Sequence, residues 1–129
     1  MPILQSGAGQ LILSATSTGT GSWYRVNQKM GDLTFQSVQV GTSVAATITS
    51  TVKIEVSNDG VNALTSLTTP MVIAGDSPAT GGLTAGCVLA AGQHWEYVRA
   101  NLSGYGATSA ASTGARSNVS VYVSGTMRS

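Results

Sequence analysis

The sequence predicts an all-β protein that folds as a single-domain β-sandwich of about eight strands. Three observations support this fold class. Apolar and polar residues alternate from Val44 to Val56, which is the pattern of a half-buried strand. Short apolar segments elsewhere are separated by clusters of Gly, Ser, Asn and Asp. No segment combines a sustained 3.6-residue period with helix caps.

The composition fits this class. The chain has 129 residues, of which 42% are hydrophobic and 9% are charged, and it contains 17 Ser and 16 Thr. The length favours one domain, and the hydrophobic fraction is high enough for a packed core. We expect residues 1–9 to form an N-terminal arm, residues 10–127 the sandwich and residues 128–129 a short tail.

Four strands are expected in the first half of the chain. Turn formers at Ser17–Gly21 and Met30–Asp32 separate the earlier ones, and the last ends in a tight turn at Asn58–Gly60. In this last strand the even positions are expected to face the core and the odd positions, including Lys53 and Glu55, the solvent, with a bend near Ser50. The four expected strands are Leu11–Ala15, Ser22–Gln28, Leu33–Val40 and Val44–Val56.

Four more strands are expected in the second half. The separators are Gly75–Gly82, Ala91–Gly92 and Ser103–Gly114, and the glycine-rich Ser103–Ala107 is interpreted as a mobile loop. Whether Val98 faces the core or the solvent is left open, because a bulge could change the phase of its strand. The four expected strands are Pro70–Ala74, Leu83–Leu89, His94–Leu102 and Val119–Ser124.

Two four-stranded sheets in a jelly roll match this strand count most simply. An immunoglobulin-like sandwich is the alternative, although its paired cysteines are missing, since Cys87 is the single cysteine. A single cysteine also gives no disulfide framework and favours a reducing compartment.

Charge and composition exclude several functions. The six basic residues are scattered, and the net charge is +1, so neither a nucleic-acid surface nor a polybasic membrane patch is expected. No apolar run is long enough for a transmembrane helix. With one His, one Cys and five carboxylates, we expect no catalytic residue, no cofactor and no metal site.

Three groups of residues are candidate sites. His94 and Glu96 could pair as metal ligands or as acid and base, but without a third ligand a surface hydrogen bond is the better interpretation. Asn58–Asn62 has one carboxylate, too few for calcium, and is interpreted as a β-turn. Cys87 is interpreted as a buried small residue and not as a nucleophile.

Aromatic residues could form a platform for sugars, although core anchors are the commoner role in a small sandwich. Sugar binding is therefore kept as a minor alternative. The aromatic residues in question are Trp23, Tyr24, Phe35, Trp95 and Tyr97.

Four segments carry a resemblance that spans roughly Trp23 to Met127. They are Ser22–Arg25, Gly31–Gln36, Ile54–Gly60 and Trp95–Asn101, with Ser103 and Gly104 after the last. This series resembles small virion structural proteins of tailed bacteriophages, most of all the jelly-roll cement or decoration proteins of the capsid surface.

The resemblance implies a non-enzymatic structural protein without cofactors. Its partner would be the major capsid protein, and it would bind as a homo-oligomer, a dimer or trimer, to the outside of virions assembled in the host cytoplasm. A tail, neck or receptor- and glycan-binding virion module is the alternative that the resemblance also allows.

Overall fold

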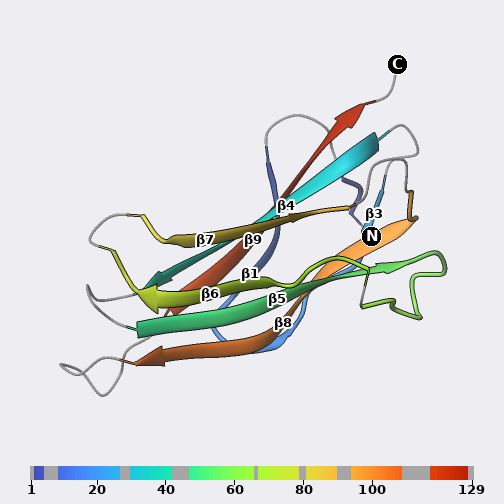
Figure 1. The fold of residues 1–129 in the computed structure, drawn as a ribbon. Helices are drawn as coiled ribbons and strands as arrows, with labels where there is room; N and C mark the ends of the chain where they lie inside the picture. Colours follow the sequence, from blue (N-terminus) through green and yellow to red (C-terminus); the bar gives the residue numbers. More distant parts are fainter. Residues whose placement is uncertain are drawn as a thin grey trace.

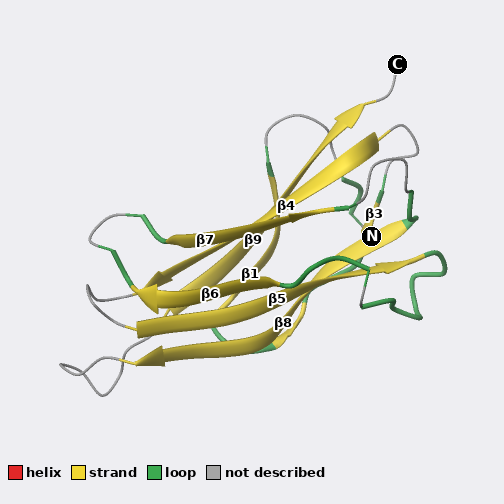
Figure 2. Ribbon diagram, in the orientation of Figure 1, coloured by secondary structure: helices red, strands yellow, loops and turns green. Residues whose placement is uncertain are grey.

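A computed structural model describes residues 2–4, 9–26, 30–41, 47–65, 67–78, 81–89, 94–108 and 117–127. The described residues form nine strands and no helix (Figures 1 and 2). The strands are β1 (Gln10–Ala15), β2 (Gly19–Thr20), β3 (Tyr24–Arg25), β4 (Met30–Gly41), β5 (Thr47–Ser57), β6 (Met71–Asp76), β7 (Leu83–Val88), β8 (Tyr97–Thr108) and β9 (Ser117–Met127).

The strands form two antiparallel sheets packed face to face (Figure 1). One has the order β1-β9-β4-β7, and the other has the order β2-β8-β5-β6, with β3 also paired to β8. The predicted all-β sandwich is therefore confirmed. The short strands β2 and β3 follow one another along the same edge of β8, so they act as one interrupted strand.

Counting β2 and β3 as one strand reveals the topology. The eight resulting strands then lie in the orders 1-8-3-6 and 2-7-4-5. The chain pairs its first strand with its last and its second with its seventh, and continues inward in this way, which is the winding of a jelly roll. This order differs from the sheets of the immunoglobulin fold, the alternative considered above.

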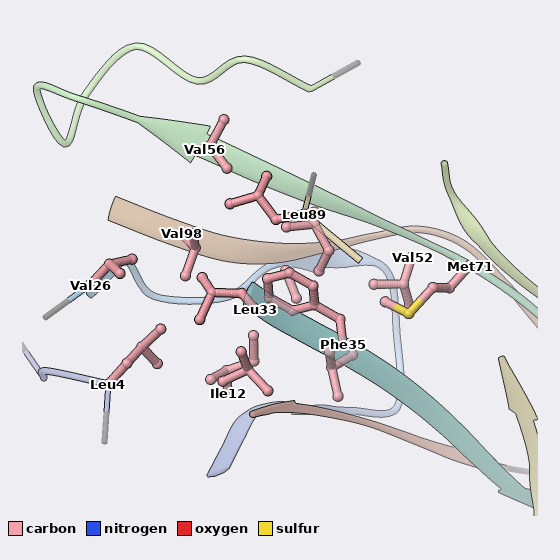
Figure 3. Packing of buried hydrophobic residues seen from close by; sticks show 14 of the residues in the cluster. Leu4, Ile12, Val26, Leu33, Phe35, Val52, Val56, Met71, Leu89 and Val98 are labelled. Atoms are coloured by element: carbon pink, nitrogen blue, oxygen red, sulfur yellow. The ribbon is translucent and has the colours of Figure 1, made fainter. Parts of the chain in front are cut away.

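Alternation along the long strands places apolar side chains between the sheets. Leu33 and Phe35 of β4 point toward Val52, Val56 and Val98 of the opposite sheet (Figure 3). The even positions of β5 from Ile48 to Val56 are buried, as predicted, and so are Val119, Val121 and Val123 of β9. Val98, Ala100 and Leu102 also face the core, which settles the register of β8.

The interior is polar at the other end of these strands. Gln39 is fully buried, and its Nε2 donates to the carbonyl of Thr49 (3.1 Å) and the Oγ of Ser117 (2.8 Å). The hydroxyl of Tyr105 donates to the carbonyl of Ser117 (2.7 Å). Because Gln39 and Thr49 belong to different sheets, this network joins the two layers.

Two bulges explain where the predicted turns and loops were wrong. Met30–Asp32 was expected to be a turn but lies in β4, where the pairing with β9 shifts register between Gly31 and Thr34 and Asp32 has a φ of +53°. Turn-forming residues mark such a bulge as readily as a turn. Ser103–Ala107 was expected to be a mobile loop but continues β8.

The second bulge changes the phase of β8. Thr51 pairs with Gly104 and Val52 with Leu102, so Ser103 is the extra residue. This is why Leu102 and Tyr105, which alternation would place on opposite faces, both contact the core.

Other boundaries also differ from the predictions. The strand expected at Ser22–Gln28 is limited to Tyr24–Arg25 among the described residues, and the one expected at His94–Leu102 begins at Tyr97. The separator Ser17–Gly21 contains β2, and Gly75 and Asp76 belong to β6. The expected residues 44–46, the separator 91–92 and residues 109–114 lie outside the described ranges.

Within the expected N-terminal arm, residues 2–4 are docked on the sandwich. Leu4 is 1% exposed and belongs to the core, where Figure 3 shows it near Val26. Its backbone N–H donates to the carbonyl of Arg25 (2.9 Å), and the N–H of Arg25 donates to the carbonyl of Pro2 (2.9 Å). Residues 2–4 are thus anchored along β3.

Candidate functional site

A charged ladder crosses the outer face of β8 and β5. Glu55 and Arg99 are register partners, and the Nε of Arg99 lies 2.6 Å from Oε1 of Glu55. The other oxygen of Glu55 accepts a hydrogen bond from Nδ2 of Asn101 (3.0 Å). Both carboxylate oxygens are therefore paired, which is the condition for burying a charge.

The prediction that Glu55 is exposed to solvent was wrong. Its odd position in β5 was expected to face solvent, yet its residue exposure is 3%. Two long neighbours on the same face, Arg99 and Asn101, bond to it, and the guanidinium of Arg99 is in turn stacked on Trp23, 4.3 Å from the ring centroid. The side chain lies on the outer face but is covered there.

The aromatic residues of this region divide between the surface and the core. The rings of Trp23 and Tyr97 meet edge to face, with centroids 6.5 Å apart. Trp95 and Tyr24 pack against the core instead, and Phe35 lies within it. The five aromatic residues therefore do not form one platform, and one face of the Trp23 ring is occupied by Arg99.

His94 and Glu96 do lie together, just before β8. The Nε2 of His94 is 3.4 Å from Oε1 of Glu96, and the Nε of Arg25 is 4.0 Å from Oε2. All three side chains are partly exposed. Among the described residues, no three His, Cys, Asp or Glu side chains gather as metal ligands. The arrangement is a partly exposed polar cluster, in which Arg25 and Glu96 form a long surface ion pair.

The chain bends after β5 over Asn58–Asn62, the segment interpreted from the sequence as a β-turn, and the side chain of Asp59 organises this turn. Oδ1 of Asp59 accepts from the N–H groups of Val61 and Asn62, both at 2.8 Å, and Oδ2 accepts from Nδ2 of Asn62 (2.7 Å). These donors hold the pKa of the carboxyl well below its usual range. Gly60 has a φ of +72°, the left-handed conformation that such a turn requires.

Cys87 lies in β7 and packs partly against the core. Burial raises the pKa of its thiol, which keeps it in the neutral and weakly nucleophilic form. Among the described contacts, no hydrogen bond links it to His94, the base that a nucleophile would need.

The feature that sequence reasoning missed is the distribution of charge between the sheets. Asp32 is the one charged residue in β1, β9, β4 and β7, which the structure describes throughout. Arg25, Lys53, Arg99 and Asp76 all belong to strands of the other sheet, as does Glu55. The order of the strands in the two sheets separates the charged residues in this way, and no local sequence pattern reveals that order.

We call the solvent side of the first sheet, apart from the exposed Asp32 near the start of β4, the uncharged face. It presents hydroxyl, amide and small apolar groups, and a hollow of about 420 Å³ lies over β4 and β9 between Gly9, Gln36 and Tyr122. The uncharged face consists of Leu11, Thr34, Gln36, Val38, Val40, Thr84, Gly86, Val88, Asn118, Ser120, Tyr122 and Ser124.

Comparisons of the chain with protein-family models, with curated proteins and with solved structures found no match. Within its described part, the chain also contains no helix that could span a membrane.

Proposed function

We propose that the protein is a non-enzymatic virion structural protein of a tailed bacteriophage, which binds the outside of the assembled capsid and stabilises it. The observation that carries this proposal is the uncharged face, on which four apolar side chains are well exposed: Leu11 (45%), Val40 (42%), Val88 (63%) and Tyr122 (36%). The resemblance to decoration proteins supplies the partner, the major capsid protein.

The chemistry of this face suits a protein partner. Hydroxyl and amide groups lose less on burial than charges do, and they regain hydrogen bonds to a partner's backbone. The depletion of charge matches the composition of interface centres. Such a face can cover a seam between capsid subunits without burying an unpaired charge.

The ionisable groups support the non-enzymatic part of the proposal. Glu55 is held by Arg99 and Asn101, and Asp59 is held by its own turn. These side chains are committed to structural bonds, whereas a catalytic acid or base needs a free position beside a substrate.

A tail, neck or receptor-binding role is the second candidate. The half-exposed pair of Trp23 and Tyr97 favours it, because aromatic rings stack on sugars. It is weaker than the first, because the guanidinium of Arg99 already covers one face of Trp23.

The experiment uses particles that lack the protein, to which purified chain is added back. A decorating protein binds only the assembled shell, so it stabilises the shell by mass action. We expect particles without it to release DNA at a lower temperature and added wild-type chain to restore the difference. Gln36→Glu, which places a charge on the uncharged face, should abolish cosedimentation with the particles.

The matched control is Thr49→Glu, on the exposed outer face of β5 in the other sheet. It adds the same charge and should leave binding intact. Particles that are equally heat-stable without the protein but fail to adsorb to cells would replace the capsid role with the receptor-binding one.

A further inference from the structure

Strand β7 is an edge of the β1-β9-β4-β7 sheet, and alternate backbone groups of it point out of the sheet. The N–H of Leu89 donates to the carbonyl of Leu33 (3.0 Å), and this pair continues the register that joins Val88 to Thr34. Since hydrogen-bonded pairs alternate in an antiparallel ladder, Leu83, Ala85 and Cys87 bond to β4. The N–H and C=O groups of Thr84, Gly86 and Val88 therefore face away from the sheet.

Within β7, which the structure describes in full, no charge, proline or bulge protects this edge. The strand reads Leu-Thr-Ala-Gly-Cys-Val, without a charge or a proline, and its six residues pair with β4 without a register shift. Charges, prolines and bulges are what usually prevent edge-to-edge pairing.

The other three edges each have such a feature. The pairing of β1 shifts register between Leu11 and Leu13, the β2 and β3 edge is interrupted, and β6 follows Pro70 and ends in Asp76. Among the four edges that the described residues form, β7 is thus the one open to pairing.

We propose that a second copy of this chain pairs with β7, antiparallel and about a two-fold axis, with Gly86 opposite Gly86. In this register Thr84 of each copy lies opposite Val88 of the other copy. The outward N–H and C=O groups of Thr84, Gly86 and Val88 then all form hydrogen bonds across the pair. A glycine on the axis brings no side chain to the centre. The absence of charge means that the symmetry opposes no like charges.

The result is a continuous eight-stranded sheet. Thr84, Gly86 and Val88 also belong to the uncharged face, so the pairing joins two such faces into one surface of twice the area. The pairing follows from the edge itself and does not depend on the proposed function. A failure of one is therefore distinguishable from a failure of the other.

The first test changes charge at the predicted register partners. Thr84→Lys with Val88→Lys places lysines opposite each other twice, and like charges directly opposite destabilise a strand pair. Thr84→Glu with Val88→Lys places opposite charges there. Sedimentation of concentrated protein measures the oligomeric state. We expect the wild-type chain to be a dimer, the double lysine variant a monomer and the Glu–Lys variant a dimer.

The matched control is Val61→Lys, since Val61 is 76% exposed in the turn after β5 and far along the chain from β7. It should dimerise like wild type. A wild-type chain that stays monomeric at every concentration, or a dimer indifferent to the charges at residues 84 and 88, would overturn the proposal.

A covalent test uses the native cysteine. The register places Ala85 opposite Cys87 of the second copy in a non-hydrogen-bonded pair, where Cα atoms lie about 4.5 Å apart and a disulfide can form. Oxidised A85C should run as a covalent dimer on a non-reducing gel. The control A74C, exposed on β6 in the other sheet, should not form the same link to Cys87. Equal crosslinking of the two variants would contradict the register.

Discussion

Asp59 shows how one exposed side chain can fix a turn. Its two oxygens accept hydrogen bonds from residues on the far side of the turn, and the hydroxyl of Ser57 donates to Oδ1 (2.7 Å). The same hydroxyl oxygen accepts from the N–H of Gly60 (3.0 Å). The turn is therefore closed by side chains, and most of these bonds favour the ionised carboxylate.

This predicts a specific pH dependence. The pKa of Asp59 is lowered by folding, so its contribution is complete above its unfolded pKa of about 4 and is lost as the pH falls toward the lower folded value. Thermal unfolding of wild type and Asp59→Asn should differ most near neutral pH. The difference in melting temperature should shrink steadily between about pH 4 and about pH 2.

A difference that stays constant across this pH range would mean that the charge of Asp59 does not matter to the turn. Thr65→Asn, an exposed change on the same connection between β5 and β6, serves as the control and should show the pH profile of wild type.

At the scale of elements, β5 is the strand whose faces are most sharply distinguished. Val52 is fully buried between the sheets, whereas Thr51 lies on the outer face and is partly exposed. Val52→Asp places an unpaired carboxylate in the core and should prevent folding, while Thr51→Asp should shift the melting temperature only slightly. Circular dichroism melts of both variants test this, and equal damage from the two would contradict the register.

The sequence predicts strands well where the alternation is long, as in β5 and β9, because there most residues at alternate positions are apolar and face the core. It predicts poorly where a bulge or a partner strand decides the conformation. Met30–Asp32 and Ser103–Ala107 contain turn formers, and only their pairing partners hold them in strands. Local propensity is outweighed there by the ladder.

The charged ladder was beyond prediction for a related reason. Glu55 and Arg99 are 44 residues apart in sequence, and no spacing indicates that they are register partners. The proximity of His94 and Glu96, by contrast, could be foreseen, because they lie two positions apart.

At the scale of the molecule, the N-terminal segment is part of the folded domain. Leu4 is buried, so Leu4→Ala should lower the free energy of unfolding by about 2–5 kcal/mol, the range for a truncated core leucine. Its neighbour Ile3 is 52% exposed, and Ile3→Ala is the matched control with a much smaller expected effect. Denaturant titrations measure both.

Deletion of residues 1–9 removes Leu4 and the hydrogen bonds that Pro2 and Leu4 share with Arg25. The truncated chain should therefore be less stable than Leu4→Ala. A truncated chain as stable as wild type would show that residues 2–4 do not contribute to the core.

The nested pairing of the jelly roll has a consequence for biosynthesis. Strand β9 lies between β1 and β4, so both wait for a partner that comes about a hundred residues after β1 along the chain. While a ribosome is still making residues 117–127, the sheet that carries the uncharged face has a gap where its central strand belongs. The opposite sheet can assemble once β8 has emerged, but the domain closes only after β9 has left the exit tunnel. Folding of this sheet must therefore wait for β9, and it should be slow, as in proteins dominated by distant contacts.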